Sequence, residues 1–582
     1  MASLLLGPMH RFADAGRVTV WVETDVPGDV EVRTADGPRA SSRTFAVAGH
    51  HFALVTVDGL VAGRVYPYEV WLAPAEEPSE DTRVWPEPGA AGPPSLLRPV
   101  GGDQPVQLVF GSCRVTAPQA KPYTLNSTED PKGLGTDALH ALALRMAETD
   151  PDTWPDALLL LGDQVYADHV SPETAARIRE RRDVTQPPGE EIADFTEYCW
   201  LYQEAWSQPE IRWLLSTVPT AMIADDHDVR DDWNISASWR AWILAQPWWD
   251  ARVTGGIMAY WLYQHLGNLD PETRAADPVW RAVADLAAQG EDAEEVLRVF
   301  ARRADRLADR GTPVGDGPDG DGDSGGIPGS PRWSYRWDLG RTRLIVIDSR
   351  LGRVVAADGT RRMVNDAAWS WIEEQTRHSG EVDHLLLGTS VPFLLTDMIH
   401  NVEAATERVA AGRFGRVVAA GAERVRRTLD LEHWAAFDHS FRKMSQLLTA
   451  VATGGHGPVP ASVVVLSGDV HHAYLARVHA DGDAAPIWQA VCSPFRNPLG
   501  PGIRRVDSIS RRRFPAAVSG RLARLLGAKA SPLDWTVTHG PWFDSQLATL
   551  RLDGRTATLL LEKTEPDGEP GGLDEVLRAP LT

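Results

Sequence analysis

The feature of this sequence that most constrains its fold is a series of short apolar runs that end in glycine, aspartate or serine. They are VQLVFGSC (106–113), ALLLLGDQ (157–164), TAMIADDHD (220–228), RLIVIDSR (343–350), HLLLGTS (384–390) and SVVVLSGDVHH (462–472). Such runs are typical of strands that are buried on both faces. A single short run can also be part of a buried helix, but six of the same form favour strands. With helical segments between them, they predict an α/β sheet whose functional groups lie at the carboxyl ends of the strands.

The first part of the chain has a different pattern, in which apolar and polar residues alternate over short stretches. Turns that contain glycine and aspartate separate these stretches, which are Arg17–Glu23, Asp29–Arg33, Phe52–Val57 and Tyr66–Leu72. Alternation with a period of two predicts strands with one buried face, and several in succession predict a small antiparallel β-sandwich. The proline- and glycine-rich stretch Pro86–Pro99 then predicts a linker.

The length of the chain also predicts more than one domain, because 582 residues exceed what one compact core usually holds. We expect an N-terminal β-sandwich domain over residues 1–98 and a larger domain over residues 104–582. Within the latter, residues 238–330 predict an insertion, whose helical part covers one side of the site. Its tryptophans could form a lid, a wall for an apolar leaving group, or core, and core is the prediction for most of Trp239, Trp242, Trp248 and Trp249.

The second half of that insertion and the later part of the chain have their own patterns. Residues 311–330 predict a flexible loop by composition. Four aspartates there have a spacing similar to a calcium loop, but no glutamate closes it, so we favour a linker; they are Asp316, Asp319, Asp321 and Asp323. Residues 400–445 predict helices. Trp535–Lys563 predicts a hairpin with a turn at Asp553-Gly554, at the edge of the main sheet.

The charge and composition of the chain restrict the classes of partner that it can bind. The net charge of −22 disfavours a nucleic-acid duplex and an anionic membrane surface, which would both repel the protein. A small phosphate ester stays open, since bound cations can reverse the potential locally. The three cysteines are far apart and predict no disulfide framework. Because the start of the sequence also lacks a leader pattern and no run is long enough for a membrane helix, we expect a cytoplasmic protein.

Four of the strand ends carry side chains that bind metals. Cys113 follows the first run, although a cysteine in that position is more often a small buried apolar residue. Asp163 follows Gly162 and can direct both carboxylate oxygens into a crevice, where it could bridge two cations. The third end places five carboxylates and an imidazole within Asp225–Asp232, a density of charge that needs protons or a cation to neutralise it. At the fourth, Asp469 and His471 are two residues apart and share one side of an extended chain.

Together these segments resemble the calcineurin-like metallophosphoesterase superfamily, and within it the alkaline phosphatase D-like metallophosphatase family. The segment Gly162–Tyr166 corresponds to the superfamily's Gly-Asp-x-x-Asp motif, with tyrosine at its last position. Asp226 stands where the family has an asparagine or aspartate ligand, and Gly468–His471 corresponds to the last motif. FGSCR matches the point where the family supplies a cysteine ligand, here Cys113. One departure is that LLLGTSVPF offers Thr389 and Ser390 where other branches have a histidine.

The resemblance implies a fold, a cofactor and an activity. The fold would be a metallophosphoesterase-type two-sheet α/β/β/α sandwich that follows a small all-β, Ig/fibronectin-like domain. The cofactor would be a binuclear centre of Fe³⁺ with Ca²⁺, or with Mn²⁺ or Zn²⁺, because thiolate and phenolate favour ferric iron on one side. The activity would be hydrolysis of phosphodiesters or phosphomonoesters by a metal-bound hydroxide.

The resemblance also implies roles for individual residues. Asp163 would bridge the metals, Asp226 would bind one of them, and the other would take the ligands Cys113, Tyr166 and Asp469 or His471. His227 would be the general acid, oriented by Asp228. Arg114 and Arg350 would bind the phosphate, since a guanidinium fork matches phosphate oxygens, or each could be a structural ion pair. His472 is expected to support a ligand by contact or to form part of the pocket wall, rather than to bind a metal itself, because His471 already fills the family's position.

Two rival functions stay open at this point. The first is a non-catalytic protein that binds a metal or a ligand on the same fold, which the missing histidine motif favours and the presence of His227 and Asp228 disfavours. The second is a metallohydrolase that acts on carboxylic esters. A purified enzyme that releases nitrophenol from phosphate esters would exclude the first, and an acyl ester in the same assay would reveal the second.

Overall fold

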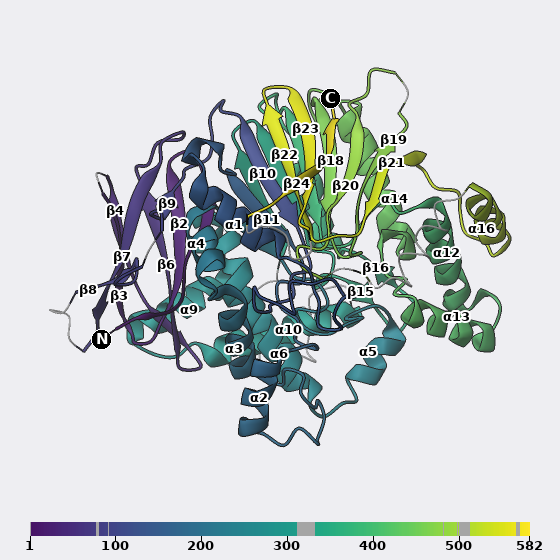
Figure 1. Ribbon diagram of the computed structural model, residues 1–582. Coiled ribbons are helices and arrows are strands. Elements are labelled where there is room, and N and C mark those ends of the chain that lie inside the picture. Colours follow the sequence, from purple (N-terminus) through teal and green to yellow (C-terminus); the bar gives the residue numbers. More distant parts are fainter. Residues whose placement is uncertain are drawn as a thin grey trace.

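All six apolar runs form strands in the computed structural model of the protein (Figure 1). The model describes residues 2–582 except 36, 77–80, 91, 311–331, 481, 498, 500–512 and 566–570. The strands are β10 (Val106–Gly111), β11 (Ala157–Leu161), β12 (Thr220–Ile223), β14 (Thr342–Ile347), β17 (His384–Thr389) and β18 (Ser462–Ser467). With helices between them, they confirm the predicted α/β fold class. The loop predicted over residues 311–330, with its aspartates, falls outside the described residues.

These strands lie in two large mixed sheets. One has the order β12-β11-β10-β22-β23-β24 and the other the order β13-β14-β17-β18-β20-β19-β21. The strands β10–β12 run parallel to one another, and so do β14, β17, β18 and β20. The remaining members are β13 (Tyr335–Leu339), β19 (Ala473–Val478), β20 (Ile487–Val491), β21 (Trp535–Trp542), β22 (Gln546–Asp553), β23 (Thr556–Lys563) and β24 (Asp574–Pro580). A further pair, β15 (Val354–Val355) and β16 (Arg361–Arg362), forms a sheet of its own.

The predicted C-terminal hairpin is present, but its position differs from the prediction. The strands β22 and β23 pair antiparallel across the expected turn at Asp553-Gly554. However, β22 also pairs with β10, and β24 takes the edge of that sheet. The preceding strand β21 belongs to the other sheet, where it pairs with β19. In Figure 1 the yellow C-terminal strands therefore stand beside the dark blue β10.

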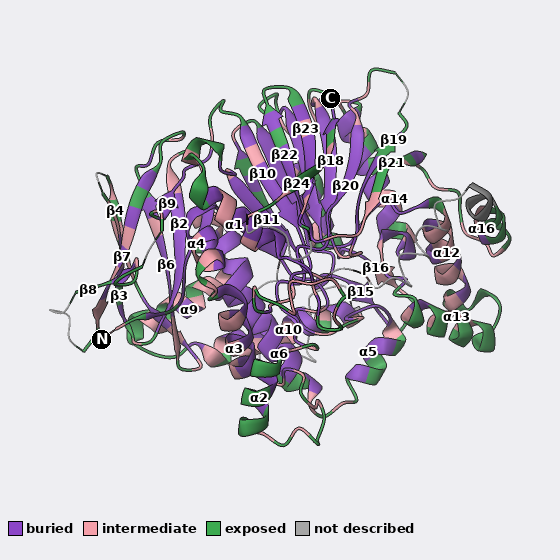
Figure 2. Ribbon diagram, in the orientation of Figure 1, coloured by how far each residue is buried: buried purple, intermediate pink, exposed green. Residues whose placement is uncertain are grey.

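Alternate residues of each strand pack on opposite faces. Leu159 of β11 and Leu386 of β17 belong to one apolar core that both sheets share. The neighbouring Leu158 packs in a second core with helices, and Leu385 packs in a third. Figure 2 shows these strands buried along most of their length. Removal of this apolar surface from water is what holds the two sheets and their helices together.

The N-terminal strands match the predicted alternation. They form one sheet in the order β1-β2-β6-β5 and another that contains β4-β3-β7-β8 with β9 beside β7. Their bounds are β1 (Leu4–Ala13), β2 (Arg17–Thr24), β3 (Gly28–Thr34), β4 (Arg39–Arg43), β5 (Phe45–Val47), β6 (His50–Asp58), β7 (Tyr66–Pro74), β8 (Thr82–Trp85) and β9 (Leu96–Leu97). The strand β1 was not predicted. This region is joined to the rest of the chain by polar contacts such as that from the Tyr68 hydroxyl to the Ser216 carbonyl, 2.8 Å long.

The two predicted helical regions are helical. The first contains α5 (Ala237–Ile243), α6 (Trp249–Ala259), a π-helical turn (Tyr260–His265), α7 (Leu266–Asn268), α8 (Pro271–Ala276), α9 (Pro278–Gln289) and α10 (Glu294–Arg310). Trp239 and Trp249 are core residues there, whereas Trp242 is 41% exposed. The second contains α12 (Asp397–Arg408), a π-helical turn (Val409–Arg413), α13 (Arg416–Thr428), the 3-10 turn η4 (Trp434–Ala436) and α14 (Asp438–Ala452), and α16 (Arg513–Leu525) packs on α12.

Further helices precede the first of these regions, and α11 lies between the two. They are α1 (Ala138–Glu148), the 3-10 turn Pro151–Thr153, α2 (Pro172–Arg181), α3 (Phe195–Trp206), α4 (Pro209–Thr217) and α11 (Asp366–Gln375). Side-chain caps fix where several of them begin; Ser171, for example, accepts a hydrogen bond from the Thr174 amide and Pro172 follows it at the start of α2. No helix among the described residues is both long and apolar enough to cross a membrane.

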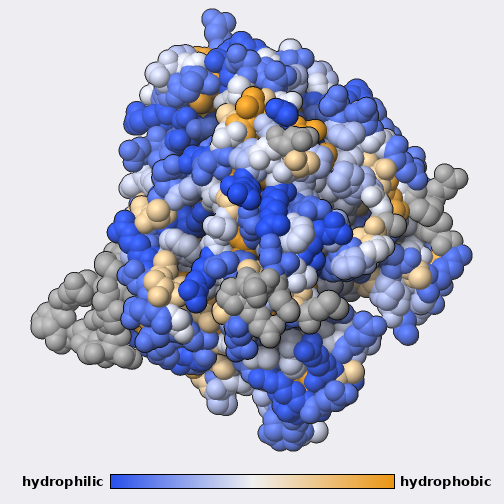
Figure 3. Space-filling view, turned by 90° about the vertical axis from the view of Figure 1, so that its left-hand side faces the viewer, coloured by the Kyte–Doolittle hydropathy of each residue, from blue (hydrophilic) through white to orange (hydrophobic). Residues whose placement is uncertain are grey.

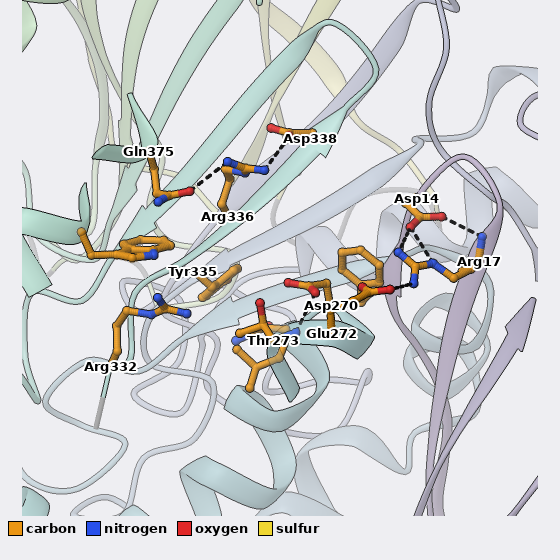
Figure 4. Close-up of a pocket in the computed structure, with 14 residues that line it drawn as sticks. Asp14, Arg17, Asp270, Glu272, Thr273, Arg332, Tyr335, Arg336, Asp338 and Gln375 are labelled. Atoms are coloured by element: carbon orange, nitrogen blue, oxygen red, sulfur yellow. Dashed lines mark hydrogen bonds and ion pairs between the residues drawn. The ribbon is translucent and has the colours of Figure 1, made fainter. Parts of the chain in front are cut away.

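The surface seen in Figure 3 is mainly hydrophilic, with apolar residues in small patches. A pocket of about 470 Å³ lies between the turn after β1, helix α8 and strand β13 (Figure 4). Its charged groups largely satisfy one another: Arg17 pairs with Asp14 at 2.7 Å and also with Glu272. Arg336 donates a hydrogen bond of 2.8 Å to Gln375 at the other end. The predicted site residues are not among the described residues that line this pocket.

Candidate metal centre

The loops after β10, β11 and β18 are tied together by hydrogen bonds at the carboxyl ends of the strands. The Cys113 amide donates to the Gly162 carbonyl at 3.2 Å, and the Arg114 amide donates to the Asp163 carbonyl at 3.1 Å. The Asp469 amide donates to the Ser112 hydroxyl at 2.9 Å. These bonds bring together segments that are up to about 350 residues apart in the sequence, because the parallel strands end at the same side of the fold.

Four of the candidate ligands have a left-handed backbone. The φ angles are 56° at Cys113, 51° at Asp163, 68° at Asp469 and 51° at His471. Residues other than glycine rarely adopt this conformation, and it is concentrated at functional sites, where the surrounding structure holds it in place. Gly468 explains part of the constraint on the last loop, since any Cβ at that position would overlap the side chain of Ser112.

Three overlapping groups of side chains could each hold a metal ion, with ligand atoms within 4.8 Å of one another. The groups are Cys113, Asp163 and His471; then Asp163, Asp226 and His227; then Asp225, Asp226 and Asp469. Asp163 belongs to the first two and Asp226 to the last two. The structure therefore brings together five predicted metal ligands from four strand ends, and Asp163 is shared between neighbouring groups.

Some carboxylates in these groups have buried oxygens that no hydrogen bond from a described residue satisfies. One oxygen of each of Asp163, Asp225 and Asp226 is buried and has no hydrogen-bond partner within the described structure. Burial, together with the neighbouring carboxylates, raises the pKa of Asp163 well above its usual range. Burial likewise raises the pKa of Asp226 to about 6. A cation would satisfy the unpartnered oxygens and neutralise this charge, so these residues fit a metal centre.

The Cys113 side adds softer ligands. The Cys113 Sγ lies 3.2 Å from Oδ2 of Asp163, and burial raises the pKa of this thiol well above its usual range. The Tyr166 hydroxyl accepts a hydrogen bond of 3.1 Å from the Asn497 amide, and burial raises the pKa of the phenol as well. Burial lowers the pKa of His471 to about 4, which keeps its imidazole in the neutral form that binds metals.

The carboxylate that contacts His227 is Asp168, and the prediction that Asp228 orients this histidine is wrong. Nδ1 of His227 lies 3.0 Å from both oxygens of Asp168. Burial alone would lower the pKa of His227, but this hydrogen bond and the nearby Asp226 and Asp163 raise it well above its usual value. Asp168 lies in the segment that contains Asp163 and Tyr166, so the sequence shows that it is near the site. The sequence does not show that its side chain points to His227.

Asp228 instead supports the backbone of the site. Its Oδ2 accepts hydrogen bonds from the amides of Asp163 (3.0 Å) and Asp225 (2.9 Å). Its Oδ1 accepts a hydrogen bond of 3.0 Å from Gln264, which lies in the π-helical turn of the insertion. The difference from the prediction arises because Asp228 points inward beneath the loop, where it is 2% exposed, rather than towards His227. Sequence reasoning missed Gln264 because an amide inside a helical segment carries no distinguishing signal.

Both predicted phosphate-binding arginines are fully engaged in structural contacts. Arg350 is buried and donates to Asp225 at 2.6 Å and to Glu432 at 2.6 and 2.8 Å. Arg114 pairs with Asp137 at 2.8 Å and also donates to the Ala205 carbonyl at 2.8 Å. The alternative of a structural ion pair is therefore the one that the structure shows for each.

The comparison with protein families matches the part of the chain that contains several of these candidate ligands. Residues 140–287, which include Asp163, Tyr166, Asp226 and His227, match the family model described as PhoD-like phosphatase. This part of the chain is similar to PhoD-like phosphatases. Residues 1–97 match a separate model, a domain of unknown function (DUF7800). Cys113, Asp469 and His471 lie outside both matched ranges.

One solved structure shows the same fold. The structure of PhoD has a TM-score of 0.52 with this chain at 12% sequence identity, and the alignment covers 99% of this chain and 92% of that one. The purple acid phosphatase PPD1 from seeds of yellow lupin (Lupinus luteus) has a TM-score of 0.46 at 10% identity, with 98% and 73% covered. A search of curated proteins found no match to the sequence.

One further histidine near the candidate metal centre was missed by the sequence analysis. His433 lies just before η4, with Nε2 3.2 Å from Oδ2 of Asp469 and Nδ1 2.6 Å from Glu403. The segment LLLGTSVPF, where other branches have the later histidine, here places Thr389 and Ser390, and both are buried. The dipeptide Glu432-His433 follows a helical segment and matches no metal-binding motif, so the sequence did not indicate it. His472 is held by its own loop through the Val470 carbonyl at 2.7 Å.

Proposed function

We propose that the protein is a two-metal hydrolase of phosphate esters. The single observation that carries this proposal is that Asp163 belongs to two overlapping groups of potential ligands, which a pair of adjacent cations requires. The match to PhoD-like phosphatases supports the ester class. The packing of helices and two sheets supports the α/β/β/α sandwich expected of the superfamily, and the two N-terminal sheets support an Ig/fibronectin-like domain over residues 1–98.

The ligands divide between two sides of Asp163. On one side Cys113, Tyr166 and His471 supply thiolate, phenolate and imidazole, a set that suits Fe³⁺. On the other side Asp226 and Asp469 supply hard oxygen ligands, with Asp225 nearby, which suit Ca²⁺ or Mn²⁺. When bound, the two cations would activate water and neutralise charge on the phosphoryl oxygens.

The residues of the chain supply the remaining steps. His227 is the proposed general acid, since Asp168 holds its Nδ1 and leaves Nε2 to donate a proton to the leaving oxygen. Asp228 and Gln264 fix the loop that carries Asp163. Arg114 and Arg350 already have partners. Neutralisation of the negative charge on a bound phosphate would therefore depend on the metals and on His227.

The test uses nitrophenyl phosphate, as a monoester and as a diester, with iron and either calcium or manganese supplied. We expect nitrophenol release by the wild type and none by Asp163→Asn. The matched control is Asp285→Asn, on the exposed side of α9, which should keep full activity. If the wild type turned over neither ester, while an acyl ester was hydrolysed or metals were bound without turnover, the phosphoesterase proposal would be wrong.

A further inference from the structure

A second pocket, here called the leaving-group pocket, borders the candidate metal centre. It has a volume of about 460 Å³ and lies between the loop after β10, the loop after β11 and helix α3. Its size falls within the range of about 300–1,000 Å³ that is typical of sites for small organic ligands. Tyr166 and Arg114 line it, and they lie next to the centre because Tyr166 is a proposed ligand and Arg114 follows Cys113.

The position of the proposed general acid links this pocket to the reaction. The rings of His227 and Tyr166 are 4.7 Å apart between centroids, so the imidazole packs against a residue that also lines the pocket. His169, a second lining residue, has its ring centroid 6.1 Å from that of His227. An organic group attached to an oxygen that His227 protonates would therefore be close to this pocket.

The pocket wall is largely apolar. Val165 and Leu201 are buried there, Val115 and Val170 are partly buried, and Tyr166 adds an aromatic face. None of these side chains can compensate a charge on a ligand. Contact with an uncharged alkyl or aryl group, by contrast, would remove apolar surface from water on both partners.

The charged groups of the pocket disfavour an anion. The guanidinium of Arg114 is already paired with Asp137, with the Ala205 carbonyl and with the side-chain oxygen of Gln208. The carboxylates are Glu204, which accepts a hydrogen bond of 2.6 Å from Thr174, and the exposed Glu173. No other arginine and no lysine is among the described residues that line the pocket. A second phosphate or a carboxylate on the substrate would therefore meet negative charge.

We propose that the leaving-group pocket selects phosphate esters whose leaving group is apolar and uncharged, and rejects leaving groups that carry further negative charge. This inference rests on the proposed function, and it identifies the substrate class of the same site. Simple aryl or alkyl esters are then substrates, whereas polyphosphorylated compounds are poor ones.

The experiment compares two aryl phosphate esters with matched leaving-group pKa, one with a propyl substituent on the ring and one with a carboxylate of similar size. With the metal-loaded wild type, we expect kcat/KM to be at least about tenfold higher for the propyl ester. In the double variant Glu173→Gln/Glu204→Gln, kcat/KM for the carboxylate ester should rise roughly three- to tenfold, and that for the propyl ester should change less than about twofold.

The matched control is Glu148→Gln/Glu180→Gln, which removes two exposed carboxylates outside the pocket and should change neither rate. Equal kcat/KM for the two esters, or an equal gain in the control variant, overturns the inference. Calorimetric binding of the two phenol products to the same protein separates the two proposals. If neither ester is hydrolysed but the propylphenol binds more tightly than the carboxyphenol, the pocket assignment holds and the phosphoesterase function fails. If neither phenol binds and neither ester reacts, both fail.

Discussion

His433 and Asp469 meet across the candidate metal centre, with Nε2 of the histidine 3.2 Å from Oδ2 of the aspartate. The contact joins the connection before η4 to the end of β18, 36 positions further along the chain. The other ring nitrogen of His433 is held by Glu403 at 2.6 Å. A histidine that a carboxylate orients through one nitrogen and that faces a candidate ligand through the other has the usual arrangement of a metal-binding imidazole.

The first prediction is that His433→Ala weakens the binding of one metal and leaves the other in place. The expected loss of affinity is about 10- to 100-fold, because the substitution removes either a ligand or the group that orients Asp469. Metal analysis of the purified protein after dialysis measures it. His439→Ala, an exposed histidine on α14, is the control and should retain both metals. Retention of both metals at wild-type affinity by His433→Ala would contradict the prediction.

The second prediction concerns the general acid. His227→Ala should slow esters with poor leaving groups by roughly 100- to 10,000-fold, and esters of nitrophenol much less, because only a poor leaving group needs the proton. Asp168→Asn should act in the same direction with a smaller effect. The measurement is kcat against leaving-group pKa for a series of aryl esters. An unchanged slope in His227→Ala would exclude this histidine as the acid, and the exposed His539→Ala should behave as the wild type.

The third prediction concerns stability and pH. Burial lowers the pKa of His10 in β1 and of His265 in the π-helical turn to about 3 each. Both stay neutral in the folded protein while the unfolded chain binds protons below about pH 6.5. The unfolding free energy should therefore fall as the pH falls from about 6.5 to about 4, by about 1.4 kcal/mol per pH unit for each histidine. Urea denaturation at several pH values measures this slope.

The variant His10→Gln isolates one of the two contributions. It should make the slope shallower by about 1.4 kcal/mol per pH unit, although loss of the contact with the Thr217 carbonyl lowers stability at neutral pH. A slope identical to that of the wild type would mean that His10 becomes protonated in the folded state. The exposed His539→Gln is the control for the same substitution outside the core.

The fourth prediction concerns metal removal. Burial raises the pKa of Asp226 to about 6, so at pH 8 its ionised form destabilises the metal-free fold relative to an unfolded chain. In a chelator, Asp226→Asn should therefore be more stable than the wild type by about 1–3 kcal/mol. With metals supplied the order should reverse, because the wild type gains binding free energy that the variant lacks. Thermal melts with and without chelator test this, and Asp285→Asn should shift neither melt.

The strands and their functional ends could be predicted because their signal is local. An apolar run that ends in Gly-Asp defines both a buried strand and the position of Asp163, without knowledge of its neighbours. Cys113 and Asp226 follow from the same rule. The strand β1 was not predicted because Gly7 and Pro8 interrupt the alternation of apolar and polar residues in LLLGPMHRFA. The strand nevertheless pairs along its length with β2.

The partners of the site residues could not be predicted, since they depend on which segments the fold brings together. Asp228 directly follows His227 in the sequence, whereas Asp168 lies 59 residues earlier, in the segment that contains Asp163. Only the folded structure shows that Asp168, and not Asp228, contacts the imidazole. Arg350 matched the expected position for phosphate binding, but Glu432, which occupies its guanidinium, lies 82 residues away. Such long-range pairings leave no pattern in a single sequence.

The pairing of β22 with β10 has a consequence for how the protein comes to be active. The strand β10, which leads to Cys113, is among the first elements of its sheet to be synthesised, and its neighbour β22 is among the last. Until β22 leaves the ribosome, one edge of β10 is unpaired, and the loop that carries Cys113 lacks part of its support. We therefore expect the proposed ligand loops to reach their final arrangement only after β22 has paired with β10. A nascent chain that lacks β22 would expose this edge to edge-to-edge aggregation.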